Sequence, residues 1–129
     1  LWRPHMRTSL VAGNWKMNGW REQVRSLLQD LLPLLRDLTA KATALGASKV
    51  LPLNHGNALS VYFADPEGNT VEIYLDMPYY ISQPHGDPLD LSKDDETLLR
   101  ETEAICRADP SFMPIAQWET RFTSVAATT

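Results

Sequence analysis

The sequence predicts a single α+β domain, and three observations indicate this fold class. The segment from Trp20 to Leu45 has apolar residues at three- and four-residue steps, which is the pattern of an amphipathic helix that covers a sheet. Farther along the chain, two runs rich in Val, Ile, Tyr and Phe flank a cluster of turn residues, which is the pattern of a β-hairpin. A length of 129 residues suits one ordinary domain with a modest core.

The composition excludes several classes of protein. With 43% hydrophobic and 22% charged residues the chain is typical of soluble globular proteins, and it has no apolar run of the roughly 20 residues that span a bilayer. The net charge is −4 and the basic residues are scattered, so neither nucleic acid nor membrane is an expected partner. The single cysteine, Cys106, is interpreted as a packing residue. One cysteine and no visible secretory signal favour a cytoplasmic location.

The N-terminal part is expected to supply one strand and the long helix. Residues 1–6 are interpreted as a leader or vector-derived segment, and Ser9–Ala12 as a short buried strand. Pro33 falls inside the helical pattern, so we expect a kink or a break near Leu32, with two helices as an alternative. Gly46 is placed to end the helix. The apolar stripe of this helix consists of Val24, Leu27, Leu28, Leu31, Leu35, Leu38, Ala42 and Leu45.

The hairpin lies within the stretch from Asn54 to Asp76 and follows a predicted strand over Ser48–Leu53. Its own strands are Ala58–Ala64 and Thr70–Leu75, and the five residues between them are nearly all turn formers. If the last residue of the first strand pairs with Thr70, the alternation of a strand divides the side chains between two faces. One face then carries Leu59, Val61, Phe63, Val71, Ile73 and Leu75, and the other carries Ser60, Tyr62, Glu72 and Tyr74.

Glu72 is the informative residue of the polar face, because this register places it directly opposite Tyr62. Two interpretations are open. The carboxylate faces solvent beside two amphipathic tyrosine rings, or it is a ligand or acid–base group inside a cupped sheet, where burial requires a cation or a proton.

The C-terminal part is expected to form an extension of the domain. Residues Met77–Pro88 form an extended arm whose prolines exclude pairing in a central strand. A helix is expected to start at Ser92 and to end before Asp109, with an apolar stripe at Leu98, Leu99, Thr102, Ile105 and Cys106. The segment up to Phe122 should dock on the body, and residues 123–129 should be frayed. The domain is therefore expected to span residues 7–122, with residues 77–122 as its extension.

Three motifs, His55–Asn57, Tyr62–Asn69 and Val71–Tyr74, resemble the last module of the vicinal oxygen chelate superfamily. That superfamily includes glyoxalase I, bleomycin-resistance proteins and extradiol dioxygenases, and the resemblance covers about Thr39–Phe122. It implies a single βαβββ module, which is half of a cup that two modules close around a divalent metal, with Fe(II) as the expected ion.

The resemblance also implies roles for individual residues. Glu72 would be the metal ligand, and Tyr62 and His55 would be catalytic. Tyr74 is placed to stack on an aromatic ligand, and His85 lies on the arm, where it could close over the cup. Two histidines and one carboxylate on Fe(II) leave positions open for a catecholate and dioxygen, whereas a glyoxalase-type metal acts as a Lewis acid. Both chemistries need ligands besides Glu72, and the first predicted strand contains no histidine.

The N-terminal segment Arg7–Gly19 resembles the first strand and loop of the triosephosphate isomerase family, and the similarity continues to about Leu35. By this resemblance Asn14 and Lys16 match the loop residues that hold the substrate. That enzyme needs an eight-stranded barrel of about 250 residues, so isomerase activity is not expected. The chain therefore looks chimeric.

The leading functional hypothesis is a vicinal-oxygen-chelate-type, dioxygenase-like protein that contributes Glu72 to a divalent-metal site for a small aromatic or diol substrate. Because one module is half a cup, a second copy of the chain is the expected partner, as a homodimer. Two alternatives remain. One is a non-catalytic chimeric or scaffold protein without a working metal centre, and the other is a metal-free small-ligand binder of the bleomycin-resistance type.

Overall fold

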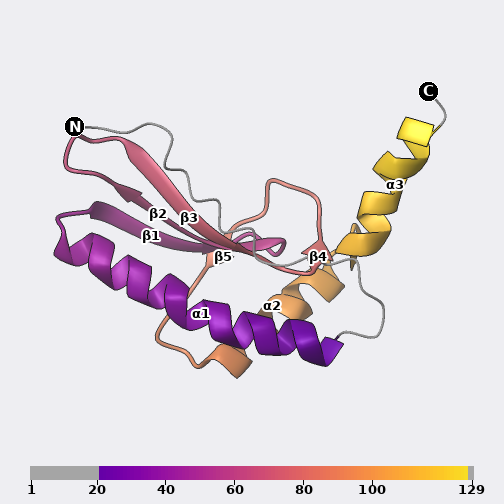
Figure 1. Cartoon of the computed structure of the whole chain (residues 1–129), viewed down its shortest axis with the longest axis horizontal. Helices are drawn as coiled ribbons and strands as arrows, with labels where there is room; N and C mark the ends of the chain where they lie inside the picture. The colour runs from indigo at the N-terminus through magenta and orange to yellow at the C-terminus, as the bar shows by residue number, and fades with distance from the viewer. Residues whose placement is uncertain (1–20, 128–129) are drawn as a thin grey trace.

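The computed structural model describes residues 21–127, which form an antiparallel four-stranded sheet with helices packed against it (Figure 1). The strand order is β3-β2-β1-β5, helix α1 lies along one face of the sheet, and α3 extends away from the body. This mixed architecture confirms the predicted α+β class, whereas residues 1–6 and the predicted strand Ser9–Ala12 lie outside the described residues. The elements are α1 (Arg21–Ala44), β1 (Ser48–Asn54), β2 (Ala58–Ala64), β3 (Thr70–Asp76), β4 (Tyr79–Tyr80), β5 (Asp87–Pro88), α2 (Asp95–Ala108), β6 (Met113–Pro114) and α3 (Ile115–Ala127).

Helix α1 is continuous through Pro33, so the expected break near Leu32 is wrong. Proline leaves the carbonyl of the residue four positions earlier without its helical donor. Here that residue is Gln29, and both it and Pro33 are exposed, so water is available to the carbonyl. The predicted stripe is buried in its first part, at Val24, Leu28 and Leu35, together with Leu32. Leu38 and Leu45 are exposed, and Leu45 lies in the turn after the last helical residue.

The hairpin has the predicted register. Ala64 pairs with Thr70 and Tyr62 pairs with Glu72, with no irregularity between β2 and β3. The apolar face packs on α1 in one core cluster, to which the hairpin contributes Leu59, Val61 and Leu75. The turn is held by Asp65, whose carboxylate accepts hydrogen bonds from the backbone N–H groups of Glu67 and Asn69 at 2.9 and 2.8 Å. Packing of one face against α1 therefore leaves the polar face on the opposite side of the sheet.

The arm and the C-terminal helices close the other end of the molecule. The arm pairs with the four-stranded sheet at the sheet's edge, where β5 pairs with β1, and its first residue, Met77, joins the core cluster. Helix α2 begins after Asp94, whose side chain accepts from the N–H of Thr97 at 2.7 Å, so the start at Ser92 is a wrong prediction. Leu98, Leu99, Thr102 and Cys106 of the predicted stripe are buried.

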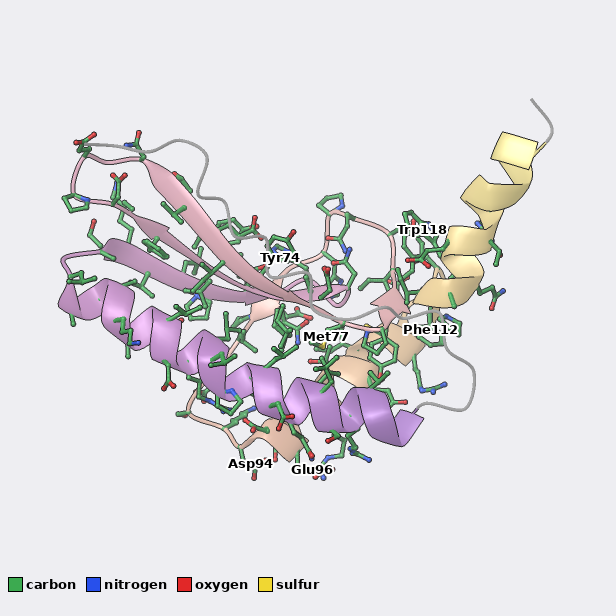
Figure 2. The ribbon with its side chains drawn as sticks, in the orientation of Figure 1. Tyr74, Met77, Asp94, Glu96, Phe112 and Trp118 are labelled. Atoms are coloured by element: carbon green, nitrogen blue, oxygen red, sulfur yellow. The ribbon has the colours of Figure 1, made fainter. Side chains whose placement is uncertain are left out.

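Helix α3 joins the arm through aromatic contacts. The Tyr80 ring stacks on Trp118 with 4.9 Å between ring centroids, and Tyr79 lies 6.0 Å from Phe112; Figure 2 shows Trp118 and Phe112 at this junction. The helical backbone continues to Ala127, beyond Thr123, where fraying is expected from the sequence. Within residues 21–127 no helix is long and apolar enough to cross a membrane.

Arg36 connects α1 to the segment that precedes α2. Its guanidinium donates to the carbonyl oxygens of Leu91 and Lys93 at 2.9 and 2.8 Å, and it forms an ion pair with Asp95. Only about a quarter of each charged side chain is exposed. Three acceptors therefore depend on one partly buried side chain, and this contact fixes where α2 begins relative to α1; Figure 2 shows Asp94 at that helix start.

Replacement of Arg36 by methionine should lower the free energy of unfolding by about 1–3 kcal/mol, because two carbonyls and a carboxylate lose their donors. Urea denaturation of the two proteins measures this difference. The matched control is Arg100→Met at an exposed position of α2, which should change stability by at most about 0.5 kcal/mol. Equal effects of the two substitutions would contradict the role of Arg36.

Candidate functional site

The β1–β2 turn is held from its buried side by α2. The Asn54 side chain accepts from the N–H of Gly56 at 2.8 Å and donates to the Thr102 hydroxyl at 2.9 Å. The Cys106 thiol donates to the carbonyl of Gly56 at 3.3 Å. Burial raises the pKa of this thiol to about 12, so it remains a protonated packing group, as predicted. The backbone of His55, which lies between Asn54 and Gly56, is therefore fixed.

His55 forms hydrogen bonds through both ring nitrogens. Nδ1 lies 2.7 Å from the carbonyl oxygen of His85, and Nε2 lies 3.0 Å from the hydroxyl of Tyr62. A carbonyl oxygen only accepts, which assigns the proton of the neutral ring to Nδ1. Nε2 then accepts the hydrogen bond that the Tyr62 hydroxyl donates. The two rings meet edge to face, with centroids 5.8 Å apart.

Glu72 extends this line on the neighbouring strand. The Ser60 hydroxyl donates to Glu72 Oε1 at 2.8 Å, and Glu72 lies directly opposite Tyr62. The pKa of Tyr62 is raised, first by burial of the phenol and then by Glu72, whose carboxylate competes with His55 Nε2 for the single phenolic proton and also adds a negative charge. If His55 takes up a proton, Nε2 becomes a donor to Tyr62, and the phenol can turn its own proton toward Glu72. His55, Tyr62 and Glu72 thus lie in one line on the polar face of the sheet.

An open pocket of about 570 Å³ lies beside His55 and is lined by this residue and the loop Gln83–Gly86. The loop is held against the turn, because the Gln83 side chain donates to the carbonyl of His55 at 2.9 Å and accepts from the N–H of His85 at 3.1 Å. The His85 ring is paired with Asp87 through Nε2, at 3.0 Å. The pocket therefore adjoins the histidine end of the line.

Of the five residues singled out in the sequence, His55, Tyr62 and Glu72 are brought together. Tyr74 lies opposite Ser60 on the same face and is 60% exposed, on the side of the sheet away from α1 (Figure 2). His85 contributes its backbone carbonyl rather than its ring. Three further hydrogen-bonding residues were not predicted from the sequence: Gln83 and Asp87 on the arm, and Ser60. Only Ser60 could have been found, because it shares the polar face.

The donor set expected for Fe(II) does not fit the described residues. Two histidines and a carboxylate are required, yet no three His, Cys, Asp or Glu side chains come together within residues 21–127. His55 reaches Glu72 only through Tyr62, and the His85 ring is turned to Asp87. No step is therefore assigned to a metal here, and iron binding stays a prediction.

Fold and site together define a small α+β domain with a histidine, a tyrosine and a carboxylate in line on the polar face of an antiparallel sheet. In comparisons with known proteins the chain is similar to a triosephosphate isomerase from Clostridium acetobutylicum, with 35% identity over 79 residues. The match takes in 54% of this chain, which spans about a third (32%) of that protein. No family model matches the chain, and no solved structure matches it.

These findings correct the recognition made from the sequence. Membership of the vicinal oxygen chelate superfamily is wrong, because no family model matches and the relative that does match is a triosephosphate isomerase. The turn of the hairpin explains the error. Asp65 caps two backbone N–H groups and Gly68 has a positive φ of 87°. This is turn chemistry that any tight hairpin can use, so the motif reports a turn and not a family.

Gly56 tests how tightly the turn is packed. Its φ is +76°, and a Cβ there would lie 2.2 Å from Ile81 Cδ1. Gly56→Ala should destabilise the protein by about 2–5 kcal/mol, the sum of a strained backbone and overpacking. Gly68→Ala is the matched control, because φ is +87° with no atom within 4 Å, and it should cost only about 1–2 kcal/mol. If urea denaturation gave equal losses of stability for the two variants, the turn at Gly56 would have space for a Cβ atom.

The pKa of Tyr62 tests its link to Glu72. In Glu72→Gln the pKa should fall toward the ordinary value, because the contributions of the carboxylate disappear, and it should stay raised to the extent that burial acts alone. Tyrosine ring carbons followed by NMR between pH 8 and 12 report this shift. As a control, Glu67→Gln in the exposed turn should leave the pKa of Tyr62 unchanged. If the pKa of Tyr62 were the same in Glu72→Gln as in the unaltered protein, the proposed link between the two side chains would be contradicted.

Proposed function

We propose that the polar face of the sheet binds a small planar ligand that carries a hydroxyl group, and that it does so without a metal ion. The observation that carries this proposal is the hydrogen-bonded line from His55 through Tyr62 to Glu72, next to the exposed ring of Tyr74.

The aromatic residues supply the surface for such a ligand. Tyr62 is opposite Glu72 and Tyr74 is opposite Ser60, so the two tyrosines are diagonal neighbours on adjacent strands, about 7–8 Å apart at their backbones. Tyrosine rings offer flat apolar area at low cost in conformational entropy. A planar ring can therefore lie against Tyr74 with an edge toward Tyr62.

Glu72 supplies the polar contact. Its carboxylate is exposed, and one of its oxygens already accepts from Ser60, which fixes the direction of the group. An ionised carboxylate accepts several hydrogen bonds, so a hydroxyl of the ligand can donate to it. The pocket beside His55, at about 570 Å³, is of the size that small molecules occupy and can take the rest of the ligand.

The activity named for the relative is not carried over to this chain. The chain spans 32% of that protein, and neighbouring strands in the described sheet are all antiparallel, whereas the isomerase barrel is parallel. A scaffold without a ligand is the competing proposal, and a binding experiment decides between them.

Catechol is a suitable first probe, because it is planar and carries two hydroxyl donors. In NMR titrations the ring signals of Tyr62 and Tyr74 should shift together, with a dissociation constant of about 1 mM or lower, which corresponds to roughly 4 kcal/mol of binding free energy. Glu72→Gln should weaken binding about tenfold through the loss of a charged acceptor. Tyr74→Ala should abolish the saturable shifts.

Tyr80→Phe is the matched control, because Tyr80 lies in β4, which pairs with β6 outside the four-stranded sheet, and its ring stacks on Trp118 of α3. This variant should leave catechol binding unchanged. The absence of saturable shifts at several millimolar, or equal binding by all three variants, would contradict the proposal and favour the scaffold.

A further inference from the structure

We infer that the natural ligand of this face is a small organic cation, with an ammonium group attached to a planar ring and held between the tyrosines and Glu72. This inference rests on the proposed function and adds the charge of the ligand to it. It is carried by the distribution of charge on the sheet and by the placement of the two rings.

The charged residues that β2 and β3 contribute to the polar face are all negative. Neither strand contains a lysine, arginine or histidine, and β3 places Glu72 and Asp76 on the same face, with Tyr74 between them. Neither of these carboxylates belongs to the ion pairs seen among the side chains that the structure describes, Arg25–Glu96, Arg36–Asp95, His85–Asp87, Lys93–Glu101 and Arg107–Glu103. An anionic ligand would meet repulsion from both groups, and a cation would be attracted by both.

The tyrosine rings add a second attraction that is specific for cations. The face of an aromatic ring carries partial negative charge and attracts an ammonium group that lies within about 6 Å of its centre. Methylated ammonium groups gain most, because they are weakly hydrated and fit between rings. Glu72 neighbours both rings, with Tyr62 across from it on β2 and Tyr74 two residues along β3, so one cation can contact both rings and the carboxylate.

The hydrogen-bond directions agree with this charge. The single proton of Tyr62 is taken up by His55 Nε2 or by Glu72, so the phenol has no donor left for a ligand, and Glu72 only accepts. Tyr62 and Glu72 therefore offer hydrogen-bond acceptors and negative potential to a ligand. The ligand must supply a hydrogen-bond donor or a positive charge.

Three para-substituted phenols test the inference: (4-hydroxyphenyl)trimethylammonium, 4-tert-butylphenol, which is neutral and has nearly the same shape, and the anionic 4-hydroxybenzoate. At low ionic strength the cation should bind at least tenfold more tightly than the neutral probe, and the anion should bind most weakly. The preference should shrink in 0.5 M NaCl, because salt screens charges on an open surface. This salt effect is measured on the unaltered protein and does not depend on any variant folding.

Glu72→Gln should reduce the preference for the cation to about threefold or less, and Asp76→Asn should reduce it partly. Glu67→Gln, in the exposed turn, should leave it unchanged. Equal binding of the cation and the neutral probe would overturn the inference while the proposed planar-ligand site stands. Failure of all three probes and of catechol would overturn both.

Discussion

The position of the site depends on a small buried polar contact between the β1–β2 turn and α2. The Asn54 side chain satisfies the N–H of Gly56 and the hydroxyl of Thr102 at once, and both Asn54 and Thr102 are almost fully buried. Buried polar groups are costly when unpaired, so this arrangement has few alternatives. It sets the direction of His55, and through His55 it sets the partners of Tyr62 and the place of the arm loop at Gln83.

The core and the polar face are coupled by the alternation of the strands. Leu59, Val61 and Leu75 are buried against α1, and each has neighbours in sequence that face the other way. A slip of one residue between β2 and β3 would carry Glu72 into the apolar core, where an unpaired carboxylate is strongly disfavoured. The free energy that fixes the core therefore also fixes Tyr62 opposite Glu72.

The local sequence pattern was sufficient to predict features that depend on neighbouring residues alone, such as strand register and the buried face of a helix. The pairing of Tyr62 with Glu72 follows from turn residues and alternation, and the buried positions of α2 follow from helical spacing. Contacts between distant segments were beyond such reasoning: the carbonyl of His85 reaches a ring 30 residues earlier, and Asn54 meets Thr102 at a separation of 48. The family resemblance failed for a related reason, because a motif made mostly of turn chemistry recurs wherever a hairpin needs that turn.

The direction of the hydrogen bonds gives the site its chemical character. The His85 carbonyl can only accept, so it holds the proton of His55 on Nδ1 and turns Nε2 into the acceptor for Tyr62. The Ser60 hydroxyl donates its hydrogen bond to Glu72. Tyr62 and Ser60 thus already use their protons within the protein, while lone pairs of Tyr62 and Glu72 remain. The proposed ligand site would therefore favour electron-poor groups, a hydroxyl proton or an ammonium group, over a ligand rich in acceptors. The same backbone carbonyl that orients one histidine therefore determines which ligands the opposite end of the line can hold.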